Sequence, residues 1–337
     1  MSEGSAQPTA ISCDDPEVAV DRVLRQVLRE ADLALRPGEI PVRESRAHLV
    51  EWHGTQAILR CVPTPRGLAG SLGQDVRWLH SFLIRLTDLG FPAPRPLPAF
   101  AGKSWTAVHG VLWEVVSYLP GHSVGWADQP SMEDVGGLLA RYHAMVRSIE
   151  VSGQRPSALP LAEVPAVLLS GSLESAGVTA DECGVIRHLA ERLAGDLRAA
   201  RSVIADRVII HGDFTNDNVL ASGAPPSATG VIDFALAHAE TPLADIGYAL
   251  WRSGRPAEHA RRLDLTRVRR YLRGYRSVMP LSADQASVIP VYLLGRGLQM
   301  IAKRARAAQP ETGMLAQVRW LSANAGAVTD AMVDAGS

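Results

Sequence analysis

A short segment near residue 211 constrains the fold of this 337-residue chain more than any other feature. An apolar run, 208–210, leads into His211 and Asp213, and Asn218 follows on the same loop and opens a second apolar run. A third apolar run ends at Asp233. Short apolar runs bounded by turn-forming residues are typical of strands. The pattern therefore predicts two short strands joined by a turn, with polar side chains at their ends.

The spacing of these polar residues suits phosphoryl transfer. An aspartate on such a loop can accept the proton of an attacking hydroxyl, while an asparagine and a second aspartate offer hard oxygen ligands to Mg²⁺. We therefore expect Asp213 to be the catalytic base, and Asn218 and Asp233 to be the metal ligands. Each could instead be a loop residue that only caps a turn or braces the loop.

These residues also carry a resemblance to a known family. The chain reads H-G-D-x-x-x-x-N-V-L, then G-V-I-D-F, then Leu243-Ala244-Asp245-Ile246. This pattern resembles the aminoglycoside phosphotransferase family, with its choline-kinase-like and homoserine-kinase-like relatives. Weaker upstream matches extend the resemblance over roughly residues 40–300. They are Leu59-Arg60, the segments 90–94 and 118–121, and the motif L-L-A-R-Y-H at 138–143.

The resemblance implies an α+β, two-lobed, protein-kinase-like fold that binds ATP or GTP and Mg²⁺. We expect residues 1–15 to be disordered and 16–119 to form a small β-rich, nucleotide-binding lobe. Residues 120–337 should form a larger, mostly helical lobe that holds the catalytic loop and the substrate site. The reaction implied is transfer of the γ-phosphate to a hydroxyl group of a small molecule.

Hydrophobic periodicity places the individual elements. In the first lobe, strand patterns at 47–52 and 56–62 flank His53-Gly54-Thr55, and patterns at 104–109 and 111–119 flank Gly110, so both pairs predict hairpins. A helix is predicted between them at 76–89. Helical patterns in the second lobe cover 132–147, 181–205, 243–251, 258–275, 283–308 and 314–333.

The nucleotide site departs from the simplest kinase pattern. Arg60 stands where many kinases have a phosphate-binding lysine, and no glutamate lies at the position expected for its helix partner. Asp75 is the nearest acidic candidate, with His80 as an alternative. A glycine-rich loop is also missing, so the segment 44–48 should cover the phosphates, and the linker 115–118 should hold the base. The residues expected at this site are Arg60, Ser45, Val116 and Tyr118.

Other residues receive supporting or acceptor roles from the resemblance. His211 and Asp245 should brace the catalytic loop without touching substrate. Contacts to the phosphate acceptor are expected from the loop, from the segment after Asp233 and from the carboxy-terminal helices. The candidates are Asp217, His238, Glu240 and Arg296, with Gln299 and Arg304 further along the same helix. For each of these, simple packing or a solvated surface position remains the alternative.

The charge and cysteine content of the chain limit the kinds of partner that it is expected to bind. The formal net charge is -1, which predicts neither nucleic-acid nor membrane-surface binding. The chain has 3 cysteines at scattered positions, so neither a zinc site nor a disulfide framework is expected. The amino terminus lacks a basic start followed by an apolar stretch, and no apolar run reaches membrane-spanning length, so we expect a cytoplasmic location. Both a monomer and a homodimer are compatible with the sequence.

The acceptor is the least constrained part of the prediction. The resemblance to antibiotic phosphotransferases makes an antibiotic, inactivated by phosphorylation in resistance or self-protection, the leading acceptor. A metabolic kinase for an amino alcohol, sugar or homoserine-like compound is the first alternative. A nucleotide-binding pseudokinase is an alternative of another class, although the presence of Asp213, Asn218 and Asp233 opposes it.

Overall fold

The structure is a computed structural model of the chain. It describes residues 24–35, 47–62, 72–108, 111–124, 131–150, 157, 159–171, 173–174, 177–200, 203, 206–310 and 313–336. The predicted disorder at 1–15 and the predicted phosphate contact of Ser45 lie outside these residues.

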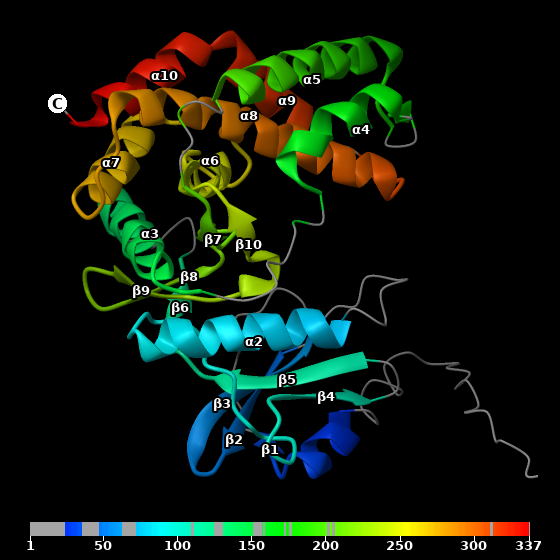
Figure 1. The fold of residues 1–337 in the computed structure, drawn as a ribbon, viewed down its shortest axis with the longest axis vertical. Coiled ribbons are helices and arrows are strands. Elements are labelled where there is room, and N and C mark those ends of the chain that lie inside the picture. Colours follow the sequence, from blue (N-terminus) through cyan, green and yellow to red (C-terminus); the bar gives the residue numbers. More distant parts are fainter. Residues whose placement is uncertain are drawn as a thin grey trace, which may run out of the picture. The chain divides into compact units, whose positions relative to one another are not determined.

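The chain divides into two compact units (Figure 1). The first contains the residues up to Val76 together with Arg95–Tyr118, and the second contains Arg77–Pro94 together with the chain from Leu119 onward. The first unit is built on a β-sheet and the second is mainly helical, which confirms the predicted α+β class.

A five-stranded antiparallel sheet forms the first unit, in the order β1-β2-β3-β5-β4. Both predicted hairpins are confirmed, and the positive φ angles of His53 and Gly54 form the turn of the first. Alternate side chains of the central strands, such as Ala57 and Leu59, are fully buried. The strands are β1 Ala34–Leu35, β2 Ala47–Trp52, β3 Thr55–Val62, β4 Trp105–Val108 and β5 Val111–Ser117.

The helix predicted at 76–89 is α2, Leu72–Asp88. Its residues from Arg77 onward belong to the second unit, and their apolar side chains recur at helical spacing on one face. Trp78 and Phe82 stack with ring centroids 5.8 Å apart, and Phe82 also contacts Phe234, two residues beyond Ile232. This helix therefore helps to bury the segment that carries Asp233.

Helices α6 and α8 form the centre of the second unit. Every residue of α6 except Arg252 is buried, and α6 packs against α8. Figure 1 shows α6 nearly end-on beside α8. A Cβ on Gly247 would lie 2.8 Å from Tyr292 Cβ, so only glycine allows this close approach. The helices of the unit are α3 Met132–Val146, α4 Val164–Ser170, α5 Ala180–Ala200, α6 Pro242–Ser253, α7 Leu265–Arg276, α8 Ala283–Arg306, α9 Met314–Ala323 and α10 Ala325–Val333.

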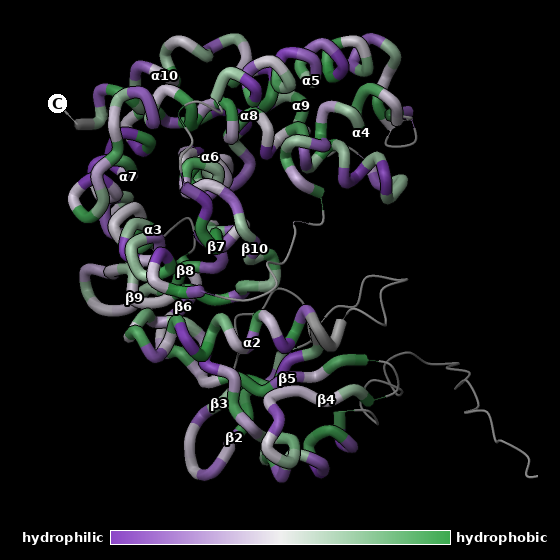
Figure 2. Tube along the Cα trace, in the orientation of Figure 1, coloured by the Kyte–Doolittle hydropathy of each residue, from purple (hydrophilic) through white to green (hydrophobic). Residues whose placement is uncertain are grey.

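Helix α7 shows how an arginine-rich sequence forms part of a core. It is mainly hydrophilic in Figure 2, yet it packs against α3 and buries Val268, Tyr271, Leu272 and Tyr275. Because these residues recur at three- and four-residue spacing, they share one face of the helix. Its arginines are therefore left to the remaining faces.

Short strands in the second unit position the predicted catalytic loop, residues 211–218. β7 pairs antiparallel with β10, and β8 and β9 form the hairpin predicted from the sequence. Because β8 and β9 run antiparallel, the residues before β8 and after β9 lie together, and Ile232 N–H donates to Asn218 O at 2.8 Å. The strands are β6 His122–Ser123, β7 Val208–Ile210, β8 Val219–Ser222, β9 Ser227–Val231 and β10 His238–Glu240.

Two helix predictions were wrong in extent. The helix predicted at 258–275 begins only at Leu265, because the Asp264 carboxylate caps it by accepting from two backbone N–H groups. The helix predicted at 314–333 is two helices, which separate at Asn324, whose amide donates to Trp320 O at 2.8 Å. The helix predicted at 181–205 is observed as α5, Ala180–Ala200, and residues 201–202 and 204–205 lie outside the described residues.

Candidate active site

The catalytic loop leaves β7 in a tight turn. Gly212 has φ +77°, and a Cβ there would lie 2.5 Å from Leu236 O, so both the conformation and the space require glycine. Thr215 N–H donates to Asp213 O at 2.8 Å, and Asn218 N–H donates to Thr215 O at 2.9 Å. These bonds bring Asp213 and Asn218 to the same side of the loop.

Asp213 lies at the centre of a group of polar contacts. Asn218 Nδ2 donates to Asp213 O at 2.8 Å and approaches Asp213 Oδ2 at 3.3 Å. Arg296 Nη2, from α8, donates to the other carboxylate oxygen, Oδ1, at 3.0 Å. The Asp213 side chain remains 34% exposed, so a small hydroxyl compound can reach it.

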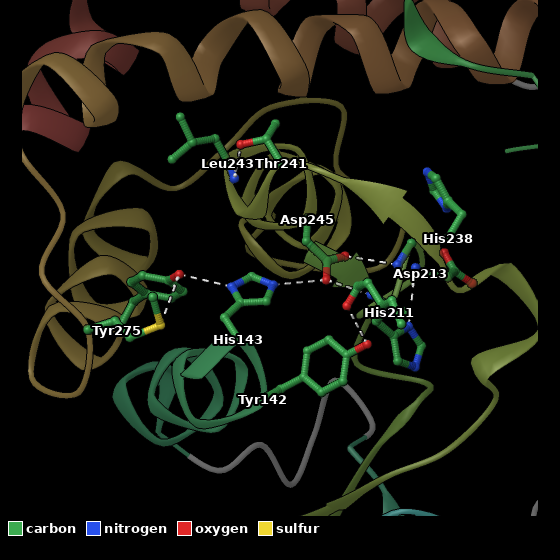
Figure 3. A network of polar contacts seen from close by, with 12 residues as sticks. Tyr142, His143, His211, Asp213, His238, Thr241, Leu243, Asp245 and Tyr275 are labelled. Atoms are coloured by element: carbon green, nitrogen blue, oxygen red, sulfur yellow. Dashed lines mark hydrogen bonds and ion pairs between the residues drawn. The ribbon is translucent and has the colours of Figure 1, made fainter. Parts of the chain in front are cut away.

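Asp245, in the first turn of α6, holds the start of the loop (Figure 3). Its Oδ2 accepts from His211 N–H at 2.8 Å and its Oδ1 accepts from Gly212 N–H at 3.0 Å. His143 Nε2 lies 3.1 Å from the same Oδ2. Burial alone would raise the pKa of Asp245, but the hydrogen bond and the charge of His143, aided by His211, outweigh it and lower the pKa. The carboxylate therefore stays ionised and accepts only.

His143 links this carboxylate to α7. Its Nδ1 lies 2.9 Å from Tyr275 Oη, and Figure 3 shows the imidazole between that hydroxyl and Asp245. Because an ionised carboxylate only accepts, Nε2–H donates to Asp245, and Nδ1 is left to face the Tyr275 hydroxyl. The motif at 138–143 thus ties α3, α6 and α7 to the catalytic loop.

His211 braces the loop internally. Its Nδ1 accepts from Asp213 N–H at 3.2 Å, which leaves Nε2–H to donate to Ile232 O at 3.0 Å. The ring packs against Phe234 at a centroid distance of 4.6 Å. One imidazole therefore joins the loop that carries Asp213 to the strand end that carries Asp233.

Asp233 adopts a left-handed conformation, with φ 60° and ψ 66°. Its Oδ1 accepts from Ala235 N–H at 3.3 Å, and the turn that follows buries Phe234. The donor set fits Mg²⁺: Asn218 uses its amide nitrogen toward Asp213, so its Oδ1 is the atom suited to a cation, and Asp233 adds carboxylate oxygen. Phosphate and water oxygens would complete such a site.

The three candidate acceptor contacts near the loop have protein partners. Asp217 forms an ion pair with Arg252 Nη2 at 2.8 Å, which ties the loop to α6. His238 is 7% exposed, its Nδ1–H donates to Leu236 O at 2.7 Å, and burial lowers its pKa. Glu240 Oε1 accepts from Thr241 N–H at 3.0 Å at the start of α6.

Arg296 and Gln299 act together on α8. Arg296 Nη1 donates to Gln299 Oε1 at 2.8 Å, and Gln299 Nε2 donates to Leu159 O at 2.7 Å. The guanidinium also lies over the Tyr248 ring, 4.8 Å from its centroid. Arg304 was also a predicted contact to the phosphate acceptor. Its Nη1 instead donates to Pro310 O at 3.1 Å.

Lys303 was not among the site residues predicted from the sequence. It is half-buried, and the pKa of its ammonium group is lowered to about 8, first by burial and then by the charge of Arg296, while Asp213 opposes the shift. The seven-residue spacing from Arg296 was an available signal, because such residues share a helix face.

In the first unit, the expected helix partner of Arg60 is corrected. Its Nε forms an ion pair with Glu114, the residue directly opposite on β5, and Glu114 is 1% exposed. Asp75 and His80 on α2 were the sequence candidates for this contact. Of the other nucleotide candidates, Val116 is buried in β5 and Tyr118 is half-buried just beyond it.

A loop with an aspartate and an asparagine, followed by a hairpin that ends in a second aspartate, is the arrangement expected of a kinase-type phosphotransferase. The sequence model of the phosphotransferase enzyme family matches residues 21–281, and the chain belongs to that family. The resemblance seen in the sequence is thereby confirmed.

Individual relatives agree with this assignment. A homoserine kinase of Polaromonas naphthalenivorans (strain CJ2) is 30% identical over 223 residues, which cover 63% of this chain and 65% of the relative. The match thus spans just under two thirds of that relative. A microcompartment-associated aminopropanol kinase has 20% identity and a TM-score of 0.67, covering 94% of this chain and 98% of that one. An amicoumacin kinase in complex with AMP-PNP, Ca²⁺ and Ami has 18% identity and a TM-score of 0.61, covering 93% and 95%.

The two structural likenesses confirm the kinase-like fold over nearly the whole chain. Among the helices of the described residues, none is long and apolar enough to cross a membrane.

Proposed function

We propose that this chain transfers the γ-phosphoryl group of ATP to a hydroxyl group of a small metabolite. The observation that carries the proposal is the Asp213 carboxylate, held beside the Asn218 amide on a loop that Asp245 anchors through two backbone N–H groups. A carboxylate that is fixed but still exposed is suited to orient and deprotonate an alcohol.

In the proposed step, the acceptor hydroxyl lies against a carboxylate oxygen of Asp213. The hydroxyl oxygen forms the new bond to the γ-phosphorus as the bond from that phosphorus to the β,γ-bridging oxygen breaks. The hydroxyl proton passes to Asp213, and the bond electrons leave with ADP. Because the transition state is loose, the residues act mainly by alignment and by neutralising charge.

Asn218 Oδ1 and the Asp233 carboxylate are the proposed Mg²⁺ ligands, and the ion would neutralise phosphate charge. The AMP-PNP and Ca²⁺ in the amicoumacin kinase support a nucleotide and a divalent cation in this fold. Arg60, fixed by Glu114, is proposed to bind phosphate oxygens, since a guanidinium is well suited to that contact.

We favour a metabolite over an antibiotic as acceptor. Eight curated relatives are named homoserine kinases, at 26–30% identity. The residue that touches the candidate base from α8 is Arg296, a cation. A polycationic aminoglycoside would be repelled there, whereas a neutral or acidic acceptor would not. An antibiotic as the phosphate acceptor is the alternative, and the experiment that follows tests both classes.

The test is Mg²⁺-dependent release of ADP and GDP with a panel of small hydroxylated metabolites and antibiotics. Asp213→Ala is compared with the native protein, and Asp330→Ala, an exposed position on α10, is the control. If the native protein and Asp330→Ala phosphorylate a metabolite and Asp213→Ala does not, the proposal is supported. If only an antibiotic is phosphorylated, the acceptor is an antibiotic and not a metabolite. Nucleotide binding without turnover of any compound favours the pseudokinase.

A further inference from the structure

A buried arginine on α8 is held directly at the candidate base. Arg296 is 6% exposed, and its guanidinium is fixed by Asp213, by Gln299 and by the Tyr248 ring. Gln299 is itself anchored to Leu159 O. These hydrogen bonds engage Nη1 and Nη2 of Arg296, and a guanidinium has five N–H donors, so donors remain for a ligand.

A second cation belongs to the same region. Lys303 lies seven residues after Arg296 on α8, so the two side chains share one face of the helix, and burial of the Lys303 side chain disfavours its charged form. Arg296 and Lys303 carry two positive charges, and Asp213 is the carboxylate that Arg296 contacts. These three side chains together therefore carry one net positive charge.

Such an excess is costly away from water unless an anion joins it. A ligand at this place lies beside Asp213, where the acceptor hydroxyl must bind. An anionic group carried by the acceptor, a few bonds from its hydroxyl, would supply the missing charge. A carboxylate matches the planar donors of a guanidinium in two parallel hydrogen bonds.

We propose that Arg296 and Lys303 bind a carboxylate group of the acceptor, so that the enzyme selects hydroxy acids over the corresponding alcohols. The inference rests on the proposed transfer to a small alcohol and specifies its substrate class. Carboxylate binding would also draw Arg296 toward the acceptor and relieve its contact with Asp213 Oδ1, leaving that oxygen for the hydroxyl.

Three matched acceptors test the inference. L-Homoserine carries an amine and a carboxylate, 4-hydroxybutyrate lacks the amine, and 3-aminopropan-1-ol lacks the carboxylate. We expect kcat/KM to be on the order of tenfold to a hundredfold higher for both acids than for the aminopropanol, as a charge-assisted hydrogen bond predicts. Calorimetric binding of each compound provides a readout that does not depend on turnover.

Variants assign the preference to the two side chains. In Arg296→Gln and Lys303→Gln, the ratio of kcat/KM between acid and aminopropanol should fall toward one. Arg306→Gln removes one charge from an exposed position of the same helix and should keep the native ratio. Circular dichroism spectra and unfolding curves check that each variant is folded.

The outcomes separate this inference from the proposed function. Equal turnover of acids and aminopropanol, or an equal loss for all three acceptors in Arg296→Gln, would overturn the carboxylate site while leaving the kinase activity in place. Failure of both acids to bind would overturn it as well. Binding of the acids through Arg296 and Lys303 without any phosphoryl transfer would support the carboxylate site and refute the proposed function.

Discussion

The carboxylate of Asp245 accepts the backbone N–H of His211 at 2.8 Å, so a buried charge on α6 sets the position of the loop that ends β7. Asp245 is 0% exposed, and Gly212 and His143 complete its contacts. All the hydrogen bonds of this carboxylate are accepted from N–H groups. If an amide NH₂ replaced one carboxylate oxygen, it would face one of those N–H groups, and two donors would meet without an acceptor.

Asp245→Asn should therefore lower both stability and activity. One unpaired buried donor costs about 1–3 kcal/mol in the free energy of unfolding. The displaced loop should lower kcat about 10–100-fold, as loss of a supporting hydrogen bond does at comparable sites. Urea unfolding and steady-state kinetics measure the two effects.

Asp284→Asn, at an exposed position in the first turn of α8, is the control and should match the native protein. The pKa of Asp245 is lowered by folding, so its ionised form stabilises the fold above the ordinary value of 3.8 and that contribution is lost as the pH falls further. The stability difference between native protein and Asp245→Asn should shrink in the same range. A native kcat in Asp245→Asn would contradict this role.

Gly212→Ala should abolish most activity. The left-handed conformation costs about 1–2 kcal/mol for alanine, and the added Cβ would also collide with Leu236 O at 2.5 Å. Gly54→Ala has the same φ of +77° but open space around its Cβ, so it isolates the conformational cost. We expect comparable kcat in native protein and Gly54→Ala. A fully active Gly212→Ala would show that the loop tolerates movement.

The local parts of this structure could be predicted from the sequence. The turn at His53-Gly54 and the β8–β9 hairpin follow from apolar runs interrupted by turn residues, which act over a few positions. The start of α7 also depends on a signal from neighbouring residues in the sequence. Asp264 is a capping residue followed by a helical pattern, and this signal was overlooked.

Pairs that are distant in the chain could not be predicted. Arg60 and Glu114 face each other because β3 pairs with β5 rather than only with its hairpin neighbour β2. Arg296 reaches Asp213 because Gly247 lets α6 and α8 pack closely. Hydrophobic periodicity identifies the buried face of a strand or helix, but it does not say which other element covers that face.

The pair of Arg60 and Glu114 gives a prediction for nucleotide binding. Glu114→Gln should loosen Arg60 and raise KM for ATP about tenfold, equivalent to about 1.4 kcal/mol, while KM for the acceptor stays unchanged. Arg60→Gln should have a similar effect, and the double variant should be less impaired than the sum predicts, because the residues act as one unit.

Glu133→Gln serves as the control, since Glu133 is also ion-paired, with Arg270, but belongs to α3 in the second unit. Additive effects of Glu114→Gln and Arg60→Gln on KM for ATP would show that the ion pair does not position the arginine.

Lys303 gives a prediction for pH dependence. Burial, with the charge of Arg296, lowers the pKa of Lys303 to about 8, although Asp213 opposes the shift. The ammonium form that would bind a carboxylate is therefore present below this pH and is lost above it. For 4-hydroxybutyrate, which has no amine of its own, kcat/KM should fall as the pH rises through about 8. The decrease should be weaker in kcat, because a bound carboxylate stabilises the charged lysine.

Lys303→Arg and Lys303→Gln separate this titration from others. Arginine stays charged, so Lys303→Arg should retain kcat/KM to higher pH, whereas Lys303→Gln should be low throughout and show no decrease near the pKa of Lys303. An alkaline decrease that is identical in native protein and Lys303→Arg would assign it to another group and remove Lys303 from acceptor binding.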